Sequence, residues 1–289
     1  ALNGVAGLRP THGCVPNTGC FPVSAAYDTI GPLARTVAEV AWAHEAIAGL
    51  APGDDCCEDR SVESWAHAYT RGVRGLRVGV PAHWCFGDIE PDVERLVRAA
   101  IADLRAMGVE VVEIELPGVE QAQAHLMPMV HADAAQVHAR RLAEQPEVFG
   151  ADVLDRMRHG QAVTGPQYAA SMRFKERWLR VLDDVFRQVD VVLTPTCPVT
   201  APLRTDTARM LETTRKISRF TYAWAMAGTP ALSVPCGHAA NGLPVGIQLI
   251  APRWHDARVL ALGAHYQSAT AHHLSVPPMV RDAMARLCP

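Results

Sequence analysis

The chain of 289 residues is 49% hydrophobic and 20% charged, with a formal net charge of −3. This composition is typical of a globular protein that buries a substantial core in one or two domains. Lysine and arginine are scattered, so we predict neither a nucleic-acid-binding stripe nor a basic membrane-binding face. No apolar run is long enough to cross a bilayer. We therefore expect a cytoplasmic protein, unless a leader preceding Ala1 has been lost.

The cysteines indicate neither a disulfide framework nor a metal site. They form no C-x-x-C pair and have no repeating spacing, whereas disulfide-rich frameworks are short and secreted. We expect reduced thiols and no structural zinc. The eight positions are Cys14, Cys20, Cys56, Cys57, Cys85, Cys197, Cys236 and Cys288.

The opening stretch, residues 4–36, is unusually dense in glycine and proline. Glycine permits left-handed backbone and close approach of another chain, and proline fixes φ and removes a donor. This stretch is therefore predicted to be neither an ordinary helix nor a long strand. It is either a surface connector or a loop with a defined path over a site that needs an accurately placed backbone.

The next elements predict a β-α-β unit. Residues 36–48 have apolar positions at helical spacing, and a polar loop with Asp54, Asp55 and two cysteines follows, which we interpret as solvated. Residues 75–80 indicate a buried strand, 90–108 an amphipathic helix with Pro91 near its start, and 109–114 another strand. Such strands pair in parallel through a right-handed crossover.

Residues 119–188 are rich in helical patterns and are predicted to form a cap packed on the sheet. His131 and His138 are two helical turns apart, but we interpret them as helix surface and not as a metal pair. A short apolar strand at 189–194 then leads into Thr-Pro-Thr at 194–196. The carboxyl end of such a strand is where open α/β sheets place ligand contacts.

The last third of the chain is predicted to be a loop at 201–210, a helix at 211–227, an antiparallel strand pair and a closing helix. The strand pair, 231–235 and 244–250, is joined through Asn241-Gly242, a strong turn signal. The closing helix covers 255–268.

Several of these segments together resemble the amidase signature family, serine hydrolases of amides. The resemblance begins with Gly-Leu-Arg-Pro-Thr-x-Gly at 7–13, Asp-Thr-Ile-Gly-Pro at 28–32 and Ala-Arg-Thr-Val at 34–37. It continues through Thr-Pro-Thr and through Gly-Leu-Pro-Val-Gly at 242–246. The signature positions that we interpret as structural are Gly7, Pro10, Thr11, Gly13, Asp28, Gly31, Pro32 and Arg35.

The resemblance implies an α/β fold in which a central mixed, largely parallel sheet is flanked by helices, with residues 1–289 forming one region. It implies hydrolysis of a small-molecule amide through a serine acyl-enzyme, with no metal or organic cofactor and no nucleic-acid or membrane partner. Thr194 and Thr196 are then expected to line the substrate pocket, although their hydroxyls could instead satisfy turn backbone. Trp224 is either a pocket wall or a core residue.

The same resemblance implies that the catalytic Ser–Ser–Lys triad lies before Ala1, so no catalytic residue is assigned here and the isolated chain is predicted to be inactive. The family's usual asparagine is replaced by Ala225. An alternative is a non-catalytic binding subunit or degenerate paralogue. The glutamine-hydrolysing subunit of a tRNA-dependent amidotransferase ranks lower, because residues 16–24 do not resemble that subfamily. The apolar strands at 189–194 and 247–250 predict a need for neighbours, and hence poor solubility or a homodimer.

Overall fold

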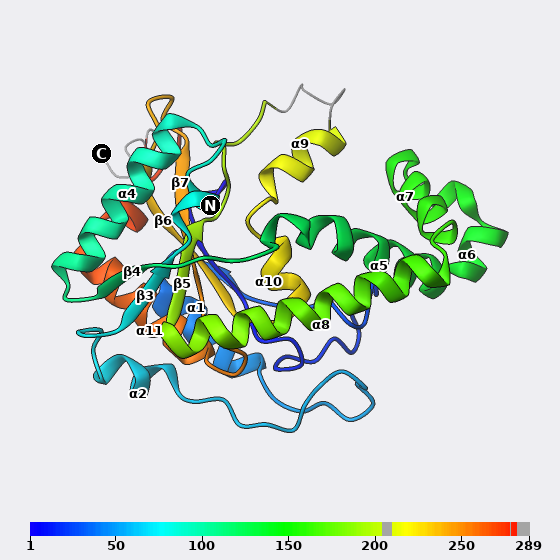
Figure 1. Ribbon diagram of the computed structural model, residues 1–289, viewed down its shortest axis with the longest axis horizontal. Coiled ribbons are helices and arrows are strands. Elements are labelled where there is room, and N and C mark those ends of the chain that lie inside the picture. Colours follow the sequence, from blue (N-terminus) through cyan, green and yellow to red (C-terminus); the bar gives the residue numbers. More distant parts are fainter. Residues whose placement is uncertain (204–209, 278, 282–289) are drawn as a thin grey trace.

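The computed structural model describes residues 1–203, 210–277 and 279–281, so most of the loop predicted at 201–210 lies outside the described residues. The described strands form one seven-stranded sheet in the order β2-β1-β6-β7-β5-β3-β4, with helices on both faces (Figure 1). The strands are β1 (Ala6–Arg9), β2 (Leu33–Ala34), β3 (Arg77–Val80), β4 (Glu110–Glu113), β5 (Val191–Pro195), β6 (Ala231–His238) and β7 (Pro244–Ile250).

The mixed sheet predicted from the sequence is confirmed, but its parallel part is smaller than expected. Among the described strands, only β3 pairs in parallel, with β4 on one side and β5 on the other. The other pairings are antiparallel, including the β6–β7 hairpin that the Asn241-Gly242 turn predicted. The expectation of a largely parallel sheet was wrong, because the opening segment adds β1 and β2 to the edge of the sheet next to this hairpin.

The predicted helices are present, with one break. The helix expected at 211–227 is divided in two, because residues 218–221 leave the helical path and the Thr221 hydroxyl donates to the Ser218 carbonyl. The α-helices are α1 (Val37–Ile47), α2 (Trp65–Thr70), α3 (Ala82–Cys85), α4 (Pro91–Ala106), α5 (Ala122–Val137), α6 (Ala139–Glu144), α7 (Ala151–Gln161), α8 (Gly165–Gln188), α9 (Met210–Ile217), α10 (Tyr222–Ala227) and α11 (Asp256–Ala269). Short 3-10 turns lie at Val119–Gln121, Pro146–Val148 and His272–Leu274.

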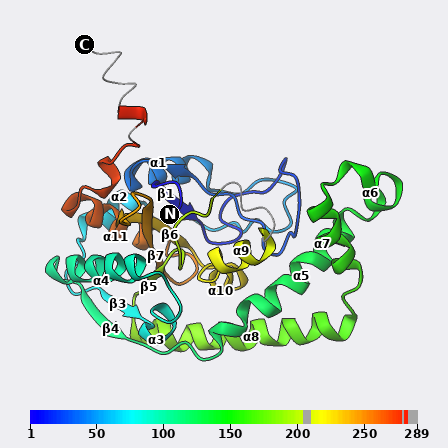
Figure 2. The ribbon, with the colours of Figure 1, turned by 90° about the horizontal axis from the view of Figure 1, so that it is seen from above.

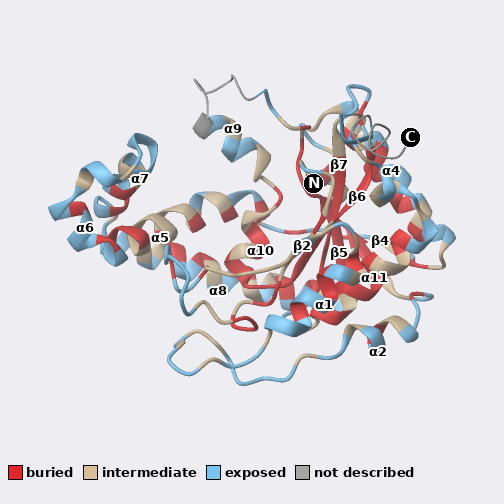
Figure 3. Cartoon of the chain, turned by 180° about the vertical axis from the view of Figure 1, so that it is seen from behind, coloured by how far each residue is buried: buried red, intermediate tan, exposed pale blue. Residues whose placement is uncertain are grey.

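The two faces of the sheet carry separate hydrophobic cores. Side chains alternate along a strand, so Val191 and Leu193 of β5 pack in the core formed with α1, α4 and α11, while Val192 packs in the core formed with α5, α8 and α10. Figure 3 shows the buried strands between these helices. Each face therefore excludes water from the central strands.

Helices α5 to α8 extend to one side of the sheet, as Figures 1 and 2 show. The base of α8 is fixed by Trp178, which is 1% exposed and donates its indole N–H to the Ala223 carbonyl at 2.9 Å. Phe174 and Leu182 of the same helix pack in the core under the sheet. Helix α8 therefore shares one hydrophobic core with the sheet and α10.

The premise behind the predicted homodimer was wrong. Strand β5 pairs with β3 and β7, and β7 pairs with β5 and β6, so both apolar strands have neighbours on each side within this chain. None of the described helices is long and apolar enough to cross a membrane.

Candidate functional site

The opening segment starts near the carboxyl end of β5 and then runs along the edge of the sheet to β2. Strand β1 pairs with both β2 and β6, so the segment contains short strands as well as the loop that was predicted. Gly31 passes so close to β1 that an added Cβ would lie 1.9 Å from the Leu8 carbonyl oxygen. The Leu8 N–H donates to the Pro32 carbonyl at 3.1 Å. Only glycine fits at position 31 without moving the backbone.

Thr11 joins this segment to the start of α11. Its backbone N–H donates to Asp256 Oδ1 at 2.8 Å, and its hydroxyl donates to Asp256 Oδ2 at 2.6 Å. The same hydroxyl accepts the Trp254 N–H at 2.8 Å. Because Thr11 and Asp256 are almost fully buried, these charge-assisted bonds fix the path of the chain after Pro10.

Other signature positions also contact backbone. The Asp28 carboxylate accepts the N–H groups of Val23 and Ser24, and the Arg35 guanidinium donates to the carbonyls of Leu274 and Ser275. The two remaining glycines are Gly7, within β1, and Gly13, which has φ of +89° and approaches the Cys56 carbonyl.

Thr194 and Thr196 lie at the end of β5, as predicted, but in different surroundings. Thr194 is fully buried, donates to the Pro195 carbonyl and accepts from Gln248 Nε2 at 3.1 Å. The Thr196 hydroxyl lies 2.9 Å from that of Ser233 on β6, and the amino group of Ala1 lies 3.4 Å from the same Ser233 oxygen. Burial lowers the pKa of this amino group. Thr196 and Ser233 thus lie where the opening segment begins.

Trp224 is fully buried on α10, with Trp84 and Trp178 around it. Its indole N–H has no partner among the described residues. Ala225, where the family has an asparagine, follows it on the same helix and is half-buried.

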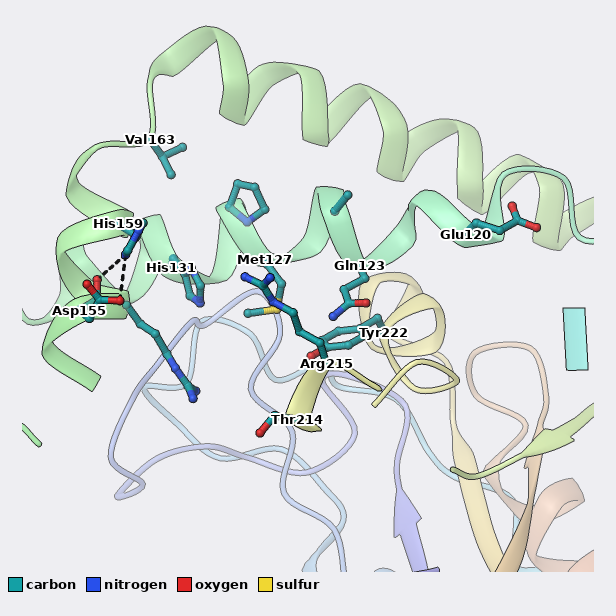
Figure 4. A pocket seen from close by; sticks show the side chains of 13 residues that line it. Glu120, Gln123, Met127, His131, Asp155, His159, Val163, Thr214, Arg215 and Tyr222 are labelled. Carbon is teal, nitrogen blue, oxygen red and sulfur yellow. Dashed lines mark hydrogen bonds and ion pairs between the residues drawn. The ribbon is translucent and has the colours of Figure 1, made fainter. Parts of the chain in front are cut away.

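A cavity of about 610 Å³ opens between the cap and α9–α10 (Figure 4). Gln123, Met127 and His131 reach it from α5, and Arg215 and Tyr222 reach it from the opposite side. Its lining residues are Glu120, Gln123, Ala124, Met127, Pro128, His131, Asp155, Arg156, His159, Val163, Thr214, Arg215 and Tyr222. Thr194, Thr196 and Trp224 are not among them.

The polar side chains of this cavity offer hydrogen-bond donors. Gln123 Nε2 and Arg156 Nε are buried and have no partner among the described residues. The pKa of His131 is lowered by burial and, to a smaller degree, by the positive charge of Arg156, so the neutral imidazole is favoured. The cavity therefore suits a ligand that accepts hydrogen bonds.

Sequence analysis did not identify this cavity. His131 and His138 serve separate roles: His131 lines the cavity, whereas His138 is buried at the end of α5, where its Nε2 lies 2.8 Å from the Pro22 carbonyl oxygen. Gln123 and Arg156 carried no local signal, because the cavity forms only when α5, α7 and α9 pack. Ser233 was also missed, since its proximity to Thr196 depends on strand order.

Comparison with known proteins identifies the family. The family profile described as "Amidase" matches residues 1–260. An amidase of Pseudomonas putida is 32% identical over 288 residues, covering 96% of this chain and 61% of the relative. A glutamyl-tRNA(Gln) amidotransferase subunit of Synechococcus sp. (strain RCC307) is 33% identical, covering 92% of this chain and 60% of the relative.

Solved structures agree with the fold. The corresponding glutamyl-tRNA(Gln) amidotransferase subunit of Thermotoga maritima superimposes with a TM-score of 0.78 at 29% identity, covering 90% of this chain and 57% of that protein. The chain thus spans about 60% of the length of the relatives that it matches. With this profile, these identities and the shared sheet, the chain belongs to the amidase signature family.

Proposed function

We propose that the chain contributes to the hydrolysis of a small-molecule amide, which binds in the cavity between α5, α7 and α9. The observation that carries this proposal is the pair of unpartnered donors, Gln123 Nε2 and Arg156 Nε, in that cavity. A buried donor without a partner is costly, and an amide carbonyl that accepts its hydrogen bond removes the cost. Met127 and Tyr222 provide the apolar walls that a small ligand needs.

No described residue is proposed as a reacting group. The Thr196–Ser233 hydroxyl pair has an amine beside it, that of Ala1, but no histidine or lysine within the contacts that the described residues make. We assign Thr194, Thr196 and Trp224 supporting positions and no catalytic role, because none of them lines the cavity.

A second candidate is glutamine as the amide. It is favoured by the relatives named as glutamyl-tRNA(Gln) amidotransferase subunits and by two arginines in the cavity, Arg156 and Arg215. A guanidinium recognises a carboxylate such as that of a free amino acid. The alternative to an enzyme is a non-catalytic binding subunit. A partner protein is compatible both with an enzyme and with a binding subunit.

Ligand-observed NMR tests the proposed binding. Small aliphatic amides, aromatic amides and glutamine are titrated against the chain and two variants. Ala124→Trp places a large ring in the cavity, whereas Ala143→Trp adds the same ring to an exposed position of α6 that does not line it. We expect binding by the parent and by Ala143→Trp, and loss of at least about tenfold in affinity in Ala124→Trp. Equal binding by all three proteins would refute the proposed cavity.

A further inference from the structure

A cysteine, a histidine and an aspartate from three distant segments meet in the interior. They are Cys14 of the opening segment, His44 of α1 and Asp256 at the start of α11, and each is 3% exposed or less. Cys14 Sγ lies 3.9 Å from His44 Nε2, which lies 3.9 Å from Asp256 Oδ1. All three ligand atoms lie within 4.8 Å of one another.

These separations suit a metal ion. An ion equidistant from three atoms so arranged would lie about 2.3–2.5 Å from each, close to a Zn–S bond of ~2.3 Å and slightly longer than a Zn–N bond of ~2.0–2.1 Å. Thiolate and imidazole ligands favour zinc over calcium or magnesium. A zinc ion, one thiolate, one carboxylate and a neutral imidazole have no net charge, which lowers the cost of burying the set.

The surrounding contacts also suit this set. The Asp256 carboxylate is oriented by the N–H and hydroxyl of Thr11, in the way that outer hydrogen bonds orient metal-binding carboxylates. His44 Nδ1 has no hydrogen-bond partner among the described residues, and Nε2 lies 3.9 Å from both Cys14 Sγ and Asp256 Oδ1. The imidazole is therefore buried without a hydrogen bond of normal length, and a metal at Nε2 would give it a strong interaction.

A catalytic cysteine–histidine pair is a poorer explanation. Cys14 and His44 do not line the cavity between α5, α7 and α9, and both side chains are almost fully buried, so the sulfur is not exposed to a substrate.

We propose that Cys14, His44 and Asp256 bind one zinc-type divalent cation that fastens the opening segment to α1 and α11. This departs from the expectation of no metal that the cysteine spacing suggested, because the ligands come from segments that only the fold brings together. The ion's role is structural and is separate from amide chemistry.

Metal content and cobalt spectroscopy test the site. The purified chain is stripped with a chelator, dialysed against excess Zn²⁺ or Co²⁺, and desalted. All proteins carry Cys20→Ser to remove an exposed thiol. We expect one zinc per chain and a Co²⁺ spectrum with the sulfur-to-metal charge-transfer band that only a thiolate ligand gives.

The variants locate the ion. Cys14→Ala should lose the charge-transfer band and the bound zinc, and His44→Gln should lower zinc affinity at least tenfold. Cys236→Ala removes another buried thiol, far from His44 in sequence, and should keep both signals. Circular dichroism tests whether each variant is folded. If Cys14→Ala does not fold, the zinc affinity of His44→Gln decides whether the proposed site binds the ion. Absence of bound metal in the parent, or a charge-transfer band that survives Cys14→Ala in folded protein, would overturn the proposal.

Discussion

At the scale of single residues, Asp54 shows how one carboxylate organises two loops. It accepts backbone N–H groups from Asn17 at 2.5 Å, Thr18 at 3.2 Å, Cys56 at 3.0 Å and Cys57 at 3.1 Å. These bonds, that from Asn17 first, lower the pKa of Asp54 below its ordinary value of 3.8. The polar loop that the sequence indicated is therefore tied to the opening segment.

We predict that Asp54→Asn destabilises the fold by about 1 kcal/mol at neutral pH, the screened value for charge-assisted bonds at a half-exposed site. A carboxyl with a depressed folded-state pKa stabilises above its unfolded pKa, and this contribution is lost as pH falls through the folded pKa. The difference in unfolding free energy between parent and variant should therefore decrease as the pH falls below 3.8, the ordinary pKa of the carboxyl. Urea denaturation from pH 7 to pH 3 measures it, with the exposed neighbour Asp55→Asn as control. A difference that does not change with pH contradicts this account.

Gly31 gives a steric prediction. Gly31→Ala places a methyl group against the Leu8 carbonyl, so β1 or residues 28–32 must shift, at a cost of about 2–3 kcal/mol. Gly165→Ala, at the first turn of α8, meets no atom within 4 Å and should be neutral or slightly stabilising. Thermal unfolding of the two variants compares them, and equal melting temperatures would show that the close approach at Gly31 carries no energetic weight.

At the scale of elements, the contact between α5 and α7 sets the width of the proposed binding cavity. The helices approach closely at Gly160, where an added Cβ would lie 2.0 Å from the carbonyl oxygen of His131. His131 and His159 both line the cavity, so a displacement of α7 changes its shape. The close packing of α7 on α5 at Gly160 therefore affects the shape of the proposed binding cavity.

Gly160→Ala is expected to destabilise α7 by about 1–3 kcal/mol and to weaken amide binding. Hydrogen exchange should quicken across 151–161 while exchange in the β6–β7 hairpin stays unchanged. Gly150→Ala, whose Cβ meets only Asp152 Oδ1 at 3.3 Å, is the matched control. Unchanged exchange in α7 would show that the two helices tolerate the methyl group.

Elements with a strong local pattern could be predicted from the sequence, and the site could not. The amphipathic spacing of α4 and the Asn241-Gly242 turn predicted their structures correctly, because each pattern reflects local burial or turn geometry. The antiparallel addition of β1 to β6 was missed, since strand pairing across more than 200 residues leaves no local mark. For the same reason, the sequence did not indicate that Gln123 and Arg156 line one cavity, or that Thr196 lies beside Ser233.

At the scale of the whole molecule, the sheet is stabilised within the chain. Its edge strands are poor templates for association, since β2 has two residues and β4 exposes Glu110 and Glu113. The homodimer therefore stays a prediction that unpaired strands do not support. Light scattering at micromolar concentration would measure the molar mass of the protein and test this prediction.

We propose that the described residues form the walls and scaffold of an amide-binding site but do not supply its reacting groups. The most direct test incubates the purified chain with the amides that it binds for a prolonged time. Chromatography then measures the remaining amides and any hydrolysis products. We expect the amides to be recovered intact at every protein concentration. Product formation that is proportional to protein concentration, lost in Ala124→Trp and retained in Ala143→Trp would contradict this proposal. It would show that the chain carries its own nucleophile.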